Sequence, residues 1–231
     1  MFKFWVDRDK QLAERFSAAI DHLGNGNVLV RAGAIRELDR VMHGSIRERN
    51  RVLQTYADFL RIRTSEGIAP DEFDCLPADV AAVLTALRSR PRVMPKREDP
   101  MDLTGIRLRG PVLTGIRLRG VRLAHAELVD ADLRDADLTG ADLQSARLIR
   151  ADLRGANLTG ALLGAADLIG SNLSHCDLTG ATLVHANLFG ANLIGAVLTD
   201  ADLRGVRLGQ TRGLSAPSEA PASPEPLAAE D

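Results

Sequence analysis

The chain has 231 residues, a formal net charge of −2 and two cysteines. The length fits one repeat domain plus one small domain, and two cysteines do not form a disulfide framework, which favours a reducing compartment. No apolar run approaches the ~18 residues of a membrane-spanning helix, and the charged start excludes a signal peptide, so the expected location is cytoplasmic.

Residues 1–90 are predicted to form a small all-α domain. Apolar residues recur at helical spacing, and the breaks between the runs carry Gly, Asn and Pro. Ser45, followed three residues later by Glu48, has the pattern of a capping box. Together these signals predict four helices, over 7–23, 28–43, 45–63 and from Pro77 onward. Residues 91–101, rich in proline and charge, are expected to form a linker.

From Leu103 to Leu208 a leucine stands at every fifth position, 22 in succession. A period of five matches neither a helix (3.6) nor a strand (2.0), so an ordinary amphipathic element is excluded. A fixed short period predicts a solenoid, in which the leucine and a small residue two positions earlier point inward. Gly recurs two positions after the leucine, which predicts a turn with positive φ in each unit.

The units read Ala-Asp/Asn-Leu-x-x, as in Ala131-Asp132-Leu133 and Ala156-Asn157-Leu158. This pattern resembles the pentapeptide-repeat family over residues 102–210. The resemblance implies a right-handed quadrilateral parallel β-helix with four units per coil, about 26 Å long at the strand spacing of roughly 4.8 Å. The whole chain is therefore predicted to be a multi-part α+β protein. Larger residues occupy the small inward position in the first units and suggest a wider or distorted first coil: Ile106, Pro111, Ile116 and Val121.

The two ends of the rod need protection because an open coil exposes backbone groups and leucines. The helical region resembles one that precedes the repeats in many bacterial relatives, and it is interpreted either as a cap over the first coil or as an independent binding module. Residues 211–231, rich in Pro, Ala, Ser and Glu, cannot bury a core and are expected to be disordered. Because nothing in the sequence covers the last coil, end-to-end homodimerisation through it is a hypothesis.

Residues twenty apart stack on one face of a four-unit coil. The position after the leucine gives an apolar column of four residues, which are the candidate partner-binding site: Val129, Ile149, Ile169 and Phe189. Contiguous exposed apolar surface often marks a partner site, although a simple stacking ladder is the alternative interpretation. A second column, of threonines, is expected only to stack: Thr139, Thr159, Thr179 and Thr199.

No catalytic, cofactor or metal site is predicted. Asp or Asn precedes many of the leucines, which indicates a structural role rather than acid–base chemistry. His125, His175 and His185 fall on different faces or coils, and the sequence has no phosphate loop, CxxC or nucleophile motif. The arginines of the third predicted helix are interrupted by acidic residues, which argues against nucleic-acid binding: Arg47, Arg49, Arg51, Arg61 and Arg63.

These observations favour a non-enzymatic scaffold that binds an unknown protein partner. The resemblance also implies two alternatives. Some family members mimic DNA and bind gyrase, but a rod with near-neutral charge and many arginines disfavours this function. In other relatives the helical region follows membrane-spanning helices, which would suit a membrane-associated signalling accessory, but this sequence has no such segment.

Overall fold

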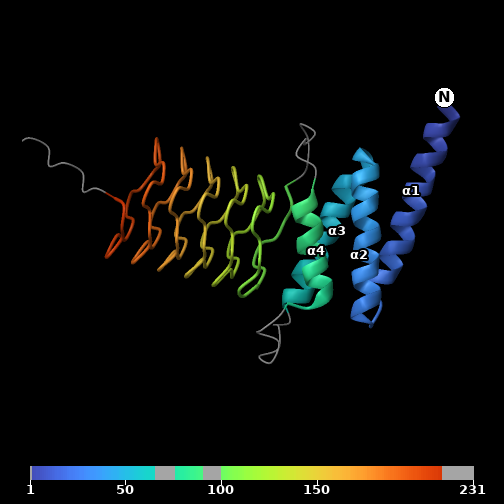
Figure 1. The fold of residues 1–231 in the computed structure, drawn as a ribbon, viewed down its shortest axis with the longest axis horizontal. Coiled ribbons are helices and arrows are strands. Elements are labelled where there is room, and N and C mark those ends of the chain that lie inside the picture. The colour runs from blue at the N-terminus through green and yellow to red at the C-terminus, as the bar shows by residue number, and fades with distance from the viewer. Residues whose placement is uncertain (1, 66–75, 91–99, 215–231) are drawn as a thin grey trace, which may run out of the picture.

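The computed structural model describes residues 2–65, 76–90 and 100–214, and Figure 1 shows four helices followed by a rod of stacked coils. The helices are α1 (Phe2–Leu23), α2 (Val28–Gly44), α3 (Ile46–Ser65) and α4 (Ala78–Ser89). Residues 91–99 of the expected linker and 215–231 of the expected tail lie outside the described residues, so the domain boundaries stay a prediction.

The four predicted helices are present, with one difference at the first. Helix α1 begins at Phe2, five residues before the predicted start, since Phe2–Val6 contains no Gly or Pro to end it. The side chain of Asn27 accepts the backbone N–H of Leu29 at 2.8 Å and caps α2. Ser45 Oγ accepts the N–H of Glu48 at 3.3 Å, as predicted for the start of α3.

The helices stack in layers on the end of the rod. Helices α3 and α4 lie next to the first coil, α2 covers them, and α1 is outermost (Figure 1). Inside this stack the Tyr56 hydroxyl of α3 donates to the carbonyl of Ile35 in α2 at 2.9 Å. The buried carboxylate of Asp79 at the start of α4 contacts Arg31 of α2 at 2.7 Å and Arg63 of α3 at 3.3 Å. These contacts tie three helices together at one end.

The junction between the helices and the first coil is mainly apolar. Leucines of α3 and α4 face inward leucines of the first coils around a cavity of about 10 Å³, which is large enough for one water but has an apolar lining. Polar contacts surround it, including Arg61 to Asp102 at 3.3 Å and Gln54 to the carbonyl of Pro100 at 3.4 Å. One continuous hydrophobic core therefore extends from the helices into the rod.

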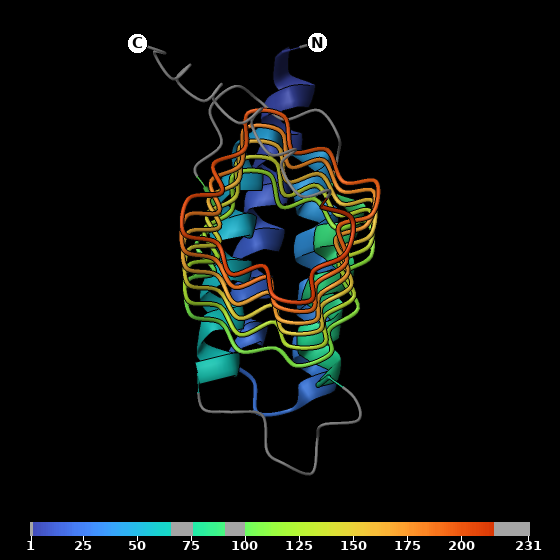
Figure 2. The ribbon, with the colours of Figure 1, turned by 90° about the vertical axis from the view of Figure 1, so that its left-hand side faces the viewer.

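The coils pair through single parallel bridges that join residues twenty apart, such as Asp132 to Asp152 and Asn157 to Asp177. Each coil therefore contains four five-residue units, and the coils overlay when viewed along the rod (Figure 2). The first coil keeps this register, since Asp102 pairs with Arg122. The expected distortion is thus absent from its backbone pairing. Ile106 and Ile116 line the apolar junction with α3 and α4, and Val121 is buried.

A turn closes every unit. The residue two positions after each leucine has a positive φ, from Gly105 at 68° to Gln210 at 59°, which confirms the prediction made from the glycine pattern. The N–H of the next small residue then donates to the leucine carbonyl, as from Ala141 to Leu138 at 3.0 Å. Leucines and alanines of the central coils are fully buried, so the rod interior is a ladder of leucines and small residues.

Candidate partner-binding surface

The acidic and amide residues before the leucines fold the turns. In each of the twelve units with Asp or Asn at this position, the side-chain oxygen accepts the N–H two residues later, as from Arg134 to Asp132 at 3.3 Å. This is an Asx turn, which mimics a backbone turn. The hydrogen bonds therefore confirm the structural role predicted for these Asp and Asn residues.

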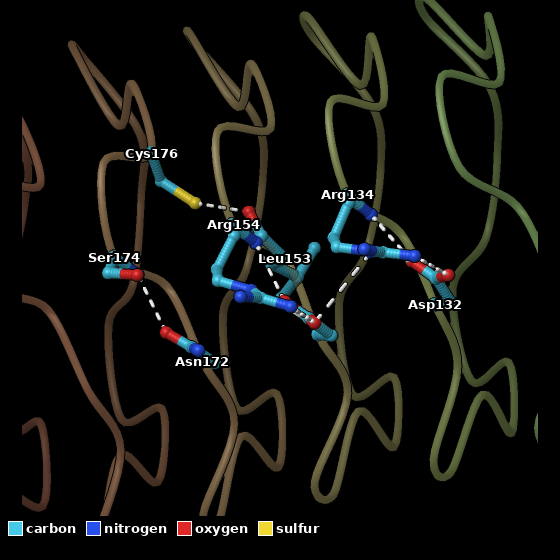
Figure 3. A network of polar contacts seen from close by, with 8 residues as sticks. Asp132, Arg134, Leu153, Arg154, Asn172, Ser174 and Cys176 are labelled. Carbon is cyan, nitrogen blue, oxygen red and sulfur yellow. Dashed lines mark hydrogen bonds and ion pairs between the residues drawn. The ribbon is translucent and has the colours of Figure 1, made fainter.

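The arginines beside these residues are held by ion pairs (Figure 3). Arg134 contacts Asp132 at 2.7 Å and reaches Asp152 of the next coil at 3.9 Å, and Arg154 contacts Asp152 at 2.6 Å. The hydrogen bonds from Arg134 lower the pKa of Asp132 to about 2. This face presents paired charge rather than the dense negative charge that a DNA mimic needs.

Cys176 occupies one of the small inward positions of the rod. Its Sγ donates to the carbonyl of Leu153 at 2.7 Å, and burial raises the pKa of the thiol to about 12 (Figure 3). A buried neutral thiol is a small apolar side chain and a poor nucleophile. Cys176 therefore fills the core as alanine does in the neighbouring units.

The predicted column of Val129, Ile149, Ile169 and Phe189 is stacked in register. The N–H of Asp130 donates to the carbonyl of Ile149 at 3.0 Å, and that of Arg150 to the carbonyl of Ile169 at 2.9 Å. The first three side chains are partly buried, whereas Phe189 is 44% exposed. The accessible apolar surface therefore increases toward the C-terminal end of the column.

Ion pairs flank the N-terminal half of this column, Val129 and Ile149. Arg150 contacts Asp130 at 2.7 Å and holds the pKa of that carboxyl below its usual value. Arg147 contacts Glu127 at 3.7 Å on the other side. A partner that covered Val129 and Ile149 would have to desolvate these charges, which costs free energy.

The C-terminal half of the column, Ile169 and Phe189, lies in a belt with little charge, residues 155–199. This belt contains no Lys or Arg, and Asp167 and Asp177 are its only acidic residues. Its exposed large apolar side chains are Leu162, Phe189, Ile194 and Val197. Counting charges by coil, rather than over the whole rod, would have revealed this belt from the sequence.

The apolar column continues onto the last coil that the structure describes. A Cβ added to Gly209 would lie 2.7 Å from Cδ2 of Phe189, so the phenyl ring leans over the last coil. Leu208, in the adjacent inward position of that coil, is 43% exposed. Among the described residues, the N–H groups of Leu198 and Leu203 have no backbone acceptor. Phe189 and Leu208 thus extend the column to a coil edge whose N–H groups lack backbone acceptors among the described residues.

The remaining candidates have local roles. His175 and His185 are turn residues with positive φ, and no group of side chains among the described residues could hold a metal ion. Of the α3 arginines, Arg51 stacks on Phe16 at 4.3 Å from the ring centroid and pairs with Glu48 at 2.8 Å. Arg61 pairs with Asp58 at 2.5 Å, Arg63 contacts Asp79 at 3.3 Å, and Arg49 is buried, so these described side chains form no free basic face. None of the described helices is long and apolar enough to cross a bilayer.

A helical stack on a coil of four five-residue units defines the class as a capped repeat solenoid. The family model for pentapeptide repeats matches the rod in eight copies between residues 102 and 210. The chain belongs to the pentapeptide-repeat family. No curated protein matches it.

Several solved structures resemble the rod. The pentapeptide repeat protein Rfr23 from the cyanobacterium Cyanothece 51142 is 31% identical over 48% of this chain and 86% of its own, with a TM-score of 0.40. The pentapeptide repeat protein alr5209 from Nostoc Pcc 7120 is 41% identical over 32% of this chain and 62% of its own, with a TM-score of 0.32. QnrB1, a plasmid-mediated fluoroquinolone resistance protein, is 20% identical over 49% of this chain and 65% of its own, with a TM-score of 0.23.

Proposed function

We propose that this protein is a non-enzymatic, cytoplasmic scaffold whose rod, a right-handed quadrilateral β-helix, binds a partner protein through the column of Val129, Ile149, Ile169 and Phe189. The observation that carries the proposal is the exposure of Phe189 within a belt that contains no cation. Contact with this belt buries apolar surface without separating ion pairs. Buried apolar area is the main favourable term in such association.

The test compares two substitutions at the same position of the unit and in the same coil. Phe189→Asp places a charge on the column, and Thr199→Asp places the same charge on the threonine face, where Thr199 is also exposed. Both proteins should have the far-UV circular dichroism of the wild type. Affinity capture from cell lysate with mass spectrometry should recover a partner with wild type and Thr199→Asp but not with Phe189→Asp. Equal capture by all three would exclude the column.

We further propose that a second copy of the chain pairs with the open end of the rod. Gly213 occupies the position where the next leucine would fall, and Ser218 and Ser223 would follow it, so the sequence supplies no further leucine layer. An identical coil edge from a second copy offers both apolar contacts and backbone partners for the unpaired N–H groups. Sedimentation velocity should show a dimer that Leu208→Arg weakens, and a monomer at high concentration would contradict this proposal.

DNA mimicry is the alternative that the family suggests. QnrB1 shares the repeat, but the arginines of this rod form ion pairs with its aspartates and leave no continuous acidic face along the described coils. We therefore expect no inhibition in a gyrase supercoiling assay. The other alternative, a membrane-associated accessory, has no supporting helix among the described residues.

A further inference from the structure

His43 lies where two helices end. It stands in the last turn of α2, and its Nδ1 is 2.9 Å from the carbonyl oxygen of Asp39. Its Nε2 is 3.1 Å from the carbonyl oxygen of Ser89, the last residue of α4. A carbonyl oxygen accepts hydrogen bonds and cannot donate them, so both ring nitrogens must carry a proton for both bonds to form. Only the imidazolium form has two N–H groups.

The electrostatic surroundings favour this charged form. The C-terminal ends of α2 and α4 both present carbonyl groups with partial negative charge to the ring. The Asp39 carboxylate adds a full charge, with Oδ1 at 3.4 Å from Nδ1, while Arg49 of α3 opposes it. The hydrogen bond to the Asp39 carbonyl is the largest cause that raises the pKa of His43, partial burial acts against it, and the Ser89 carbonyl raises it further.

The end of α4 also contacts the first coil of the rod. Arg90, directly after α4, donates to the carbonyl of Arg117 in the first coil at 3.5 Å, and Arg117 donates back to the carbonyl of Arg90. Leu87, in the last turn of α4, is fully buried against the inward leucines of the first coils. Any contact that fixes Ser89 therefore also restrains the junction between the helices and the coil.

We propose that protonated His43 is a pH-sensitive clasp that joins the C-terminal ends of α2 and α4 and so holds the helical cap on the first coil. In the neutral ring, one nitrogen lone pair faces a carbonyl oxygen, and one of the two hydrogen bonds is lost. The residue lies in an open position, with its side chain 39% exposed, so protons reach it without unfolding.

The direction of the pH effect follows from linkage. A histidine whose pKa is higher in the folded than in the unfolded state adds stability that is complete below the unfolded value of 6.5. This contribution disappears as the pH rises through the folded pKa. The clasp is therefore closed in mildly acidic solution and open in alkaline solution, and the change falls in the range where histidine titrates in cells.

Amide hydrogen exchange on the full chain tests the proposal. Peptides that cover the end of α4 are followed at pH 6 and pH 8.5, with each rate corrected for its intrinsic pH dependence. The equilibrium constant for local opening at the end of α4 should increase with pH in the wild type. The expected increase is about tenfold for each unit by which the folded pKa of His43 exceeds its unfolded value. In His43→Gln, whose amide cannot titrate, the pH dependence should vanish. His22→Gln, an exposed residue of α1, is the matched control and should behave as the wild type.

An NMR titration of the imidazole signals gives a second, independent measurement. The signal that is missing in His43→Gln should titrate above pH 6.5. The proposal is overturned if that signal titrates at or below 6.5, or if His43→Gln keeps the pH dependence of the wild type. It is also overturned if exchange at the end of α4 does not change with pH in the wild-type protein.

Discussion

Substitution of Gly180 tests one requirement of the five-residue turn, the positive φ of its backbone. The φ of Gly180 is +64°, and apart from its two chain neighbours no residue has an atom within 4 Å of a Cβ added there, so Gly180→Ala introduces no clash. A left-handed conformation costs a residue with a Cβ roughly 1–2 kcal/mol. The smaller freedom of alanine in the unfolded chain returns about 0.5–1 kcal/mol. The expected net loss is about 0.5–1 kcal/mol, or about 1–4 °C in Tm for a chain of this size.

Urea unfolding followed by far-UV circular dichroism measures this loss, provided the slope with urea is unchanged. Two further variants test the sign of the effect and its dependence on neighbouring atoms. Ala165→Gly, at φ 54°, should stabilise the rod by a similar amount. Gly195→Ala should cost more than Gly180→Ala, because its Cβ would lie 2.6 Å from Nδ1 of His175. The reasoning is refuted if Ala165→Gly destabilises the protein or if Gly180→Ala leaves it unchanged.

Three other predictions follow from burial and hydrogen bonding. Leu148→Ala, at a fully buried position, should cost about 2–5 kcal/mol in urea unfolding, and Leu208→Ala, at a position 43% exposed, less than half as much; equal losses would contradict the stacked-core account. Asp132→Asn should retain the Asx turn and lose less stability than Asp132→Ala. Because the pKa of Asp132 is lowered to about 2, the advantage of the wild type over Asp132→Asn should shrink as the pH falls from 3.8 through 2, and a gap that is undiminished in melts at pH 2 would refute the ion pair. In a Cys75→Ser background, Cys176 should resist Ellman's reagent until urea unfolds the rod, and prompt labelling would show that the coil opens.

The period of five was enough to predict the rod and the positive φ of its turns, because each unit repeats the same local demand. The helices were also predictable from Ser45 and from apolar spacing. What the sequence could not give is which helices lie against the coil. The apolar faces of all four helices look alike in sequence, and the choice depends on how Leu60, Leu84 and Leu87 fit the first ring of leucines.

The candidate surface was predictable in position but not in exposure. The register alone placed Ile149 and Ile169 on one column, yet neighbouring side chains partly bury both. Phe189 is more exposed because Gly209, without a side chain, follows it in the next coil. The role of His43 was missed because its acceptor on Ser89 lies 46 residues away in the chain. Such contacts arise from tertiary packing, which no local pattern encodes.

The structure also indicates which position of the five-residue unit can vary without disturbing the fold. Two of the five positions in each unit point inward: one holds leucine throughout, and the other holds a small residue in most units and a larger apolar residue near the ends of the rod. The position before the leucine forms the Asx turn wherever Asp or Asn stands there, and the position two after it requires positive φ. Only the position directly after the leucine has no structural demand on its side chain. The column from Val129 to Phe189 occupies this position in four successive coils, so its apolar character is not explained by the fold of the single unit. Cross-strand packing explains part of it, since the members stack on one another. It does not explain why an aromatic ring stands at the end of the column, in the belt that contains no cation, and this is why Phe189 is the residue on which we base the proposed binding function.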